Sequence, residues 1–221
     1  GEKTYYKRLN EEFKKYDAVL YELVAPEGTR VPKGGGAGSG HPVSALQKAM
    51  TQALDLSYQL SEIDYTPKHF THADMSPEQL SKAMKDRGES IWGMLLRSMG
   101  YALAKQSQDP SRSPDVELLM ALFDKNRALA LKRVMATQFE DMEGMMKAME
   151  GPDGSSLIAG RNQAALEVLK KQLGEGKKKV AIFYGAGHMP DMEKRLRDDF
   201  GLVPIGTTWL AAWDLKGDQK R

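Results

Sequence analysis

Hydrophobic and polar positions alternate differently at the two ends of the chain and in its middle. Over residues 4–16 the apolar residues recur at helical spacing opposite a charged face, which predicts an amphipathic surface helix. The run 17–24 (DAVLYELV) that follows is rich in β-formers and apolar on consecutive positions. A strand of this kind is covered on both faces, as in a parallel sheet flanked by helices.

The last third of the chain repeats this strand-and-helix pattern. Residues 179–184 (KVAIFY) predict a second buried strand, with helices over 160–173 and 190–200 on either side. A further run of β-formers predicts a strand over 202–209.

Helical spacing dominates the middle of the chain. Residues 76–79 (SPEQ) are typical of an N-cap, a proline at the first helical position and a capping-box glutamine. They predict a helix that runs to about residue 105, with an interruption near Gly88 or Gly100. The same start signal recurs at 113–115 (SPD), and helical spacing continues to residue 149.

Together these elements predict an α/β fold, with a mainly parallel sheet flanked by helices. We expect a single domain over residues 1–221, in which residues 62–150 form a large all-helical insertion.

Composition narrows the chemistry that such a fold can carry. The 221 residues contain no Cys, so disulfides, thiol nucleophiles and thiolate metal sites are excluded, and a metal would need His, Asp, Glu or backbone oxygen. A formal net charge of +2 gives no electrostatic argument for nucleic-acid binding. No apolar run approaches the ~18 residues that a membrane span needs, and no signal peptide is visible.

Two candidate residues stand where strands end, which is where ligands bind in open α/β sheets. Glu22 is a carboxylate near the end of the first strand, within an apolar run. Because burying a lone carboxylate is costly, it needs a partner. A metal or another cation would serve, and so would a structural arrangement in which Glu22 caps a helix or pairs with an Arg.

His188 ends the sequence 185–188 (GAGH), a GxxH pattern directly after the second strand. Glycines let the backbone leave the strand sharply, and the next helix begins beside the imidazole. An imidazole in that place suits a metal ligand or a general base. It also suits anion binding at the helix start.

Several segments resemble the TraB/PrgY/GumN family, which includes the Tiki proteins. Residues 16–23 (YDAVLYEL) are similar to its glutamate strand, and 183–190 (FYGAGHMP) to its second GxxH motif. The pair Arg161-Asn162 and the segment 209–213 (WLAAW) resemble the family's Arg-Asn pair and its ending. Residues 70–75 (FTHADM) match loosely. The family's first GxxH lies on a strand before the first helix, so we expect that strand upstream of Gly1 and interpret 38–41 (GSGH) as a chance match.

The resemblance implies a fold like that of erythromycin esterase and ChaN-like proteins, and a metal-dependent hydrolase that acts on a peptide or a small molecule. It implies that Glu22 and His188 are metal ligands or acid/base residues. Arg161 would orient the carboxylate or stabilise an oxyanion. The cofactor would be a divalent ion such as Mn, Co or Zn, and the missing histidine its third ligand. Cytoplasmic and exported locations both stay open.

A second function class fits the methionine-rich middle and the scarcity of histidines. The same fold would bind haem or another hydrophobic ligand without catalysis, or sequester a peptide signal. His69, His72 and Asp74 form a weaker metal-binding candidate, because their segment is expected to be a loop.

Overall fold

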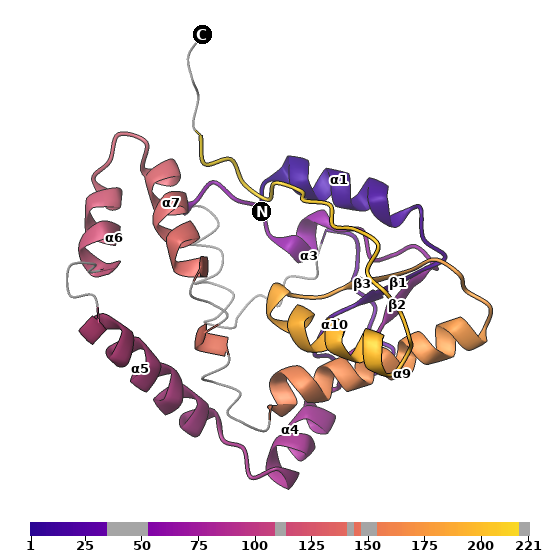
Figure 1. Cartoon of the computed structure of the whole chain (residues 1–221). Helices are drawn as coiled ribbons and strands as arrows, with labels where there is room; N and C mark the ends of the chain where they lie inside the picture. Colours follow the sequence, from indigo (N-terminus) through magenta and orange to yellow (C-terminus); the bar gives the residue numbers. More distant parts are fainter. Residues whose placement is uncertain (35–52, 109–113, 141–143, 147–153, 217–221) are drawn as a thin grey trace.

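A small parallel sheet lies at the centre of the α/β part of the molecule. The computed structural model describes residues 1–34, 53–108, 114–140, 144–146 and 154–216. Its strands are β1 (Ala18–Tyr21), β2 (Phe70–His72) and β3 (Val180–Phe183), in the order β2-β1-β3 (Figure 1). Both neighbours run parallel to β1, so the expectation of a parallel sheet is confirmed, although the sheet is small.

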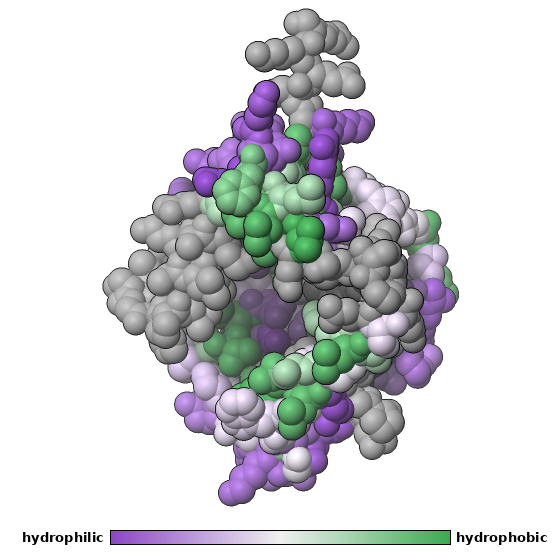
Figure 2. Space-filling view, turned by 90° about the vertical axis from the view of Figure 1, so that its left-hand side faces the viewer, coloured by the Kyte–Doolittle hydropathy of each residue, from purple (hydrophilic) through white to green (hydrophobic). Residues whose placement is uncertain are grey.

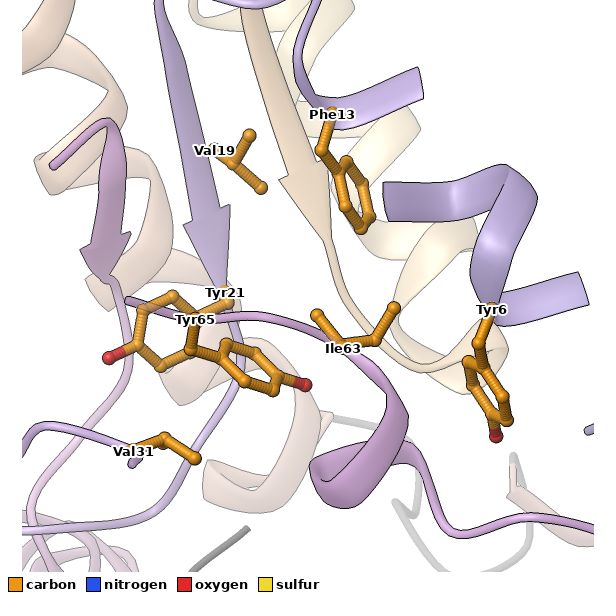
Figure 3. Packing of buried hydrophobic residues seen from close by; sticks show 7 residues of the cluster. All are labelled: Tyr6, Phe13, Val19, Tyr21, Val31, Ile63 and Tyr65. Carbon is orange, nitrogen blue, oxygen red and sulfur yellow. The ribbon is translucent and has the colours of Figure 1, made fainter. Parts of the chain in front are cut away.

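The central strand packs on both sides. All four residues of β1 are buried, with Val19 and Tyr21 on one face and Leu20 on the other. On the first face, helix α1 (Lys3–Phe13) contributes Tyr6 and Phe13 to an aromatic-rich cluster (Figure 3). This burial accounts for the consecutive apolar residues of the β1 sequence, because each face of the strand meets its own core.

The second face is covered by helices from the C-terminal third. Helix α9 (Arg161–Gly174) buries Ala165, Leu166 and Leu169, and helix α10 (Met189–Asp198) buries Met192. These side chains pack around Leu20 of β1. The sheet therefore lies between two helical layers, with the N-termini of α9 and α10 at the carboxyl ends of the strands (Figure 1).

A helical arm lies to one side of the sheet. It consists of α4 (Pro77–Asp86), α5 (Ile91–Gln108), α6 (Pro114–Leu122) and α7 (Arg127–Glu140) (Figure 1). The expected capping box opens α4: Ser76 Oγ accepts from the Gln79 N–H and the Gln79 side chain accepts from the Ser76 N–H. The interruption falls at Gly88, which has φ +65°, while Gly100 lies within α5.

Short elements complete the described chain. Helix α3 (Gln59–Glu62) precedes β2, a π-helical turn η1 (Ser156–Gly160) leads into α9, and a 3₁₀ turn η2 (Ala186–His188) leads into α10. None of the helices in the described part of the chain has both the length and the hydropathy that a bilayer crossing requires. The sequence 38–41 and most of the glycine-rich segment around it lie outside the described residues.

Three expectations from the sequence are wrong. Residues 202–209 form no strand and expose Val203 and Ile205, because no strand edge pairs with them among the described residues. The segment around His72 is a strand rather than a loop, since β2 pairs in register with β1. For the same reason residues 62–150 are not wholly helical, and the helical arm begins after β2.

Candidate active site at the carboxyl edge of the sheet

Five polar residues meet where the three strands end. Glu22 follows β1, Asp74 follows β2, and His188 lies in the turn after β3. Arg161 and Asn162 are the first two residues of α9. Because the strands are parallel, their carboxyl ends lie at one edge, and the start of α9 faces that edge. We call this set the polar cluster.

Arg161 joins two carboxylates. Its Nε and Nη2 donate to the two oxygens of Asp74 at 2.9 and 2.6 Å, which is a bidentate pairing. Nη2 also donates to Glu22 Oε1 at 2.7 Å. The Asp74 side chain is fully buried and that of Arg161 is 12% exposed, whereas the Glu22 side chain is 26% exposed. Asp74 therefore anchors the guanidinium, and Glu22 is the carboxylate that solvent or a ligand can reach.

The imidazole of His188 is held by Asn162. Asn162 Nδ2 donates to the His188 carbonyl at 3.0 Å and to Asp191 Oδ2 at 2.9 Å, so its Oδ1 is the atom that faces His188 Nδ1, at 2.7 Å. An amide oxygen only accepts, so Nδ1 carries the proton. In the neutral ring, Nε2 then keeps its lone pair, 3.6 Å from Glu22 Oε1 and 3.4 Å from Arg161 Nη1.

Glu22 is held in its ionised form. Burial alone would raise the pKa of its carboxyl group, but a hydrogen bond from His188 when Nε2 carries a proton, the Gly185 N–H and the charge of Arg161 lower that pKa to about 2. The Gly185 N–H donates to Glu22 Oε2 at 2.7 Å. A Cβ at position 185 would lie 3.3 Å from the same oxygen, so the glycine allows this close approach.

The surroundings of the cluster keep its charges fixed. Burial would lower the pKa of Arg161, but Asp74 and Glu22 raise it above its usual range, so the guanidinium stays charged. Burial raises the pKa of Tyr184, whose hydroxyl donates to the Ala73 carbonyl and whose ring meets that of His188 edge-on. The tyrosine is thus a neutral wall of the site.

A cleft opens onto the exposed part of the cluster. Its volume is about 420 Å³, and Glu22 and Arg161 form its charged part. The remaining lining residues are mostly apolar or aromatic: Leu23, Val24, Tyr58, Gln59 and Leu60. A carboxylate and a guanidinium beside apolar walls are the features of a site that orients a small organic group.

The cluster does not complete a metal site by itself. Among the described residues, no three His, Asp or Glu side chains are placed to hold an ion. Glu22 and His188 supply two donors, but Arg161 already occupies Glu22 Oε1 and its Nη1 lies 3.4 Å from His188 Nε2, where it would repel a cation. A hydrolytic metal usually has three protein ligands, so the described donor set does not fit one.

The structure brings all three predicted site residues together. The pairing of Glu22 with an Arg, one of the alternatives that its sequence context allowed, is observed. Of the weaker candidates, only Asp74 joins the site. His72 Nε2 instead contacts the Leu23 carbonyl at 2.6 Å, and His69 lies at the opposite end of β2 beside a separate pocket. The role of Asp74 as the buried partner of Arg161 was not predicted.

No protein-family model, curated protein or solved structure matches the chain in the three comparisons made with known proteins.

Proposed function

We propose that this protein is a hydrolase of peptide or ester bonds, with His188 as the general base and Glu22 and Arg161 as its electrostatic partners. The observation that carries the proposal is the fixed tautomer of His188, which points the Nε2 lone pair toward a carboxylate and a guanidinium beside a cleft. The resemblance to the TraB/PrgY/GumN family supports the same reaction class.

The chemistry assigns one role to each group. Nε2 of His188 takes a proton from a water molecule as its oxygen attacks the acyl carbon, and it later returns that proton to the leaving amine or alcohol. Glu22, already ionised, stabilises the imidazolium that forms in between. Arg161 Nη1 contacts His188 Nε2 at 3.4 Å and donates to neither carboxylate, and its second N–H can donate to the carbonyl oxygen as it becomes negative.

The divalent metal expected from the family resemblance stays a prediction, because the described donors do not fit one. We derive no step through a metal. Whether the reaction needs a metal is tested by assaying the purified protein with a chelator and after addition of Mn, Co or Zn. Activity that survives the chelator supports the proposed mechanism, and activity that needs an added ion contradicts it.

The catalytic assignment is tested with mixed peptide and ester substrates. We expect His188→Ala to lower kcat/KM by about 10²–10⁴-fold, the usual contribution of a general base. His69→Ala is the matched control, since His69 lies away from the cluster, and it should keep the wild-type rate. Circular dichroism of both variants reports folding. Equal activity in His188→Ala and wild type would overturn the assignment, and so would peptide binding without turnover.

A further inference from the structure

The helical arm exposes far more apolar surface than packing in a single chain explains. In α5, Trp92 is 75% and Leu96 66% exposed, and in α6, Met120 is 71% exposed. The exposed apolar side chains of the two helices together present on the order of 1,000 Å². A standard protein interface buries about 800 Å² per partner. This surface is therefore large enough to be an interface.

Helix α5 has two distinct apolar faces. Met94 is buried, and Tyr101, seven residues later, turns the same way and reaches Gly144. The opposite face carries a continuous exposed stripe: Trp92, Leu96, Met99 and Leu103. These residues follow at intervals of four, three and four, which is the spacing of a coiled-coil seam. The inner face thus packs within the chain, and the outer stripe fits another helix.

Helix α6 has the same two-sided construction. Ala121 is buried against α7 near Leu131. The outer face carries a second stripe at helical spacing: Val116, Leu119, Met120 and Phe123, the last directly after the helix. We call the two stripes together the outer patch.

The placement of the helices suits two-fold symmetry. Hydrophobic residues gather on one side of the molecule at the heights of α5 and α6, on either side of a hollow with hydrophilic residues at its floor (Figures 1 and 2). A two-fold axis between the two helices would place each α5 on the partner's α6, so that both contacts form at once. Space also exists for close approach on α5, since no atom lies within 4 Å of a Cβ placed at Gly100.

We propose that the outer patch is the interface of a symmetric homodimer in which α5 of each chain packs on α6 of its partner. The dimer covers both stripes and closes the hollow between the two copies. This inference is independent of the proposed hydrolase activity.

The oligomeric state of the full chain tests the proposal. Light scattering after size exclusion should give twice the 24.6 kDa chain mass. Leu96→Glu and Leu119→Glu should each weaken the dimer by at least about tenfold in Kd, because a charge enters a desolvated apolar centre. Ile205→Glu is the matched control, since Ile205 is 99% exposed outside the patch, and it should leave the mass unchanged. Circular dichroism checks that each variant is folded. If a glutamate variant is unfolded, Met99→Ala is tested in its place.

Cross-linking tests the pairing of helices directly, because the chain has no Cys of its own. Leu96→Cys and Leu119→Cys chains are prepared separately, mixed and oxidised. A disulfide formed mainly in the mixture supports the α5–α6 contact, and efficient linking of Leu96→Cys alone contradicts it. A wild-type chain that stays monomeric at high concentration, or that is monomeric in solution and binds anionic vesicles through the same residues, overturns the dimer.

Discussion

The polar cluster and the outer patch differ in how their side chains are accommodated: the cluster buries charged groups, and the patch exposes apolar ones. In the cluster, each charged group has a partner of opposite sign, and the most buried of them, Asp74, accepts two hydrogen bonds from Arg161. On the outer patch, residues that belong in a core face solvent without cover, as Trp92 and Phe123 do. In the described structure the charges of the cluster are paired within the chain, whereas the outer patch is left exposed, and we propose that a second copy covers it.

This difference indicates whether a substitution in each region changes the free energy of folding or the free energy of association. Burying a charge is costly unless it is paired, so removing one member of the cluster exposes the whole desolvation cost of the others. Substituting an apolar side chain that already faces water removes little buried apolar surface, so it changes the stability of the single chain little. Substitutions in the cluster should therefore act on folding of the single chain, and substitutions in the patch on association.

The largest effect is expected from Asp74→Asn. This change removes the anionic partner of a guanidinium that is only 12% exposed, and we expect a loss of about 3 kcal/mol or more in the free energy of unfolding. Urea denaturation measures it. The control is Asp86→Asn, which breaks a surface pair with Lys82 and should cost no more than about 1 kcal/mol. Equal losses in the two variants would contradict the anchoring role of Asp74.

The convergence of Glu22 and His188 could be predicted because it follows from strand direction alone. Each residue follows closely after an apolar run, and the ends of parallel strands meet at one edge. Asp74 could not be placed in the same way. Its strand, β2, has three residues, which is too short for a strand pattern, and its flanking prolines are typical of a loop.

The sequence predicted the structure of an apolar segment correctly only where its pattern also indicates the surface against which that segment packs. The sequence over 202–209 contains β-formers as β3 does, yet a strand requires a neighbouring edge, and no local pattern tells whether one is free. Helix α5 posed a related problem. Its spacing predicts a helix, but both Met94 and Leu96 are apolar, and only packing decides that Met94 is buried and Leu96 exposed.

A smaller effect is expected from the titration of Glu22. Its folded-state pKa of about 2 lies below the ordinary value of 4.5, so the folded chain binds fewer protons than the unfolded chain between these values. The stabilisation is fully present above pH 4.5 and is lost as the pH falls toward 2. The groups that face Glu22 are Arg161, His188 and the Gly185 N–H.

Thermal unfolding between pH 2 and 6 measures this contribution, with Glu22→Gln as the comparison. We expect wild type to be more stable by on the order of 1–2 kcal/mol at pH 6, and the difference to shrink below pH 4.5. A difference that stays constant across the range would mean that Glu22 does not titrate with folding.

The smallest effect concerns a contact between the arm side of the molecule and the polar cluster. Met146 lies over the turn that carries His188, and a Cβ at Gly187 would come within 2.6 Å of its Cε. Gly187→Ala therefore forces this side chain to move. Because the obstructing atom is the end of a flexible chain, the cost should be about 1 kcal/mol or less in the free energy of unfolding.

A double-mutant cycle with Met146→Ala isolates that contact. If the clash is with Met146, the alanine at position 187 should cost less in the Met146→Ala background, and the two effects should fail to add. Gly174→Ala is the control, since nothing lies within 4 Å of a Cβ there and its effect should be independent of Met146. Strict additivity at Gly187 would mean that the arm and the site are not in contact through Met146. The cycle thus measures how far the turn that carries His188 depends on packing from the arm side.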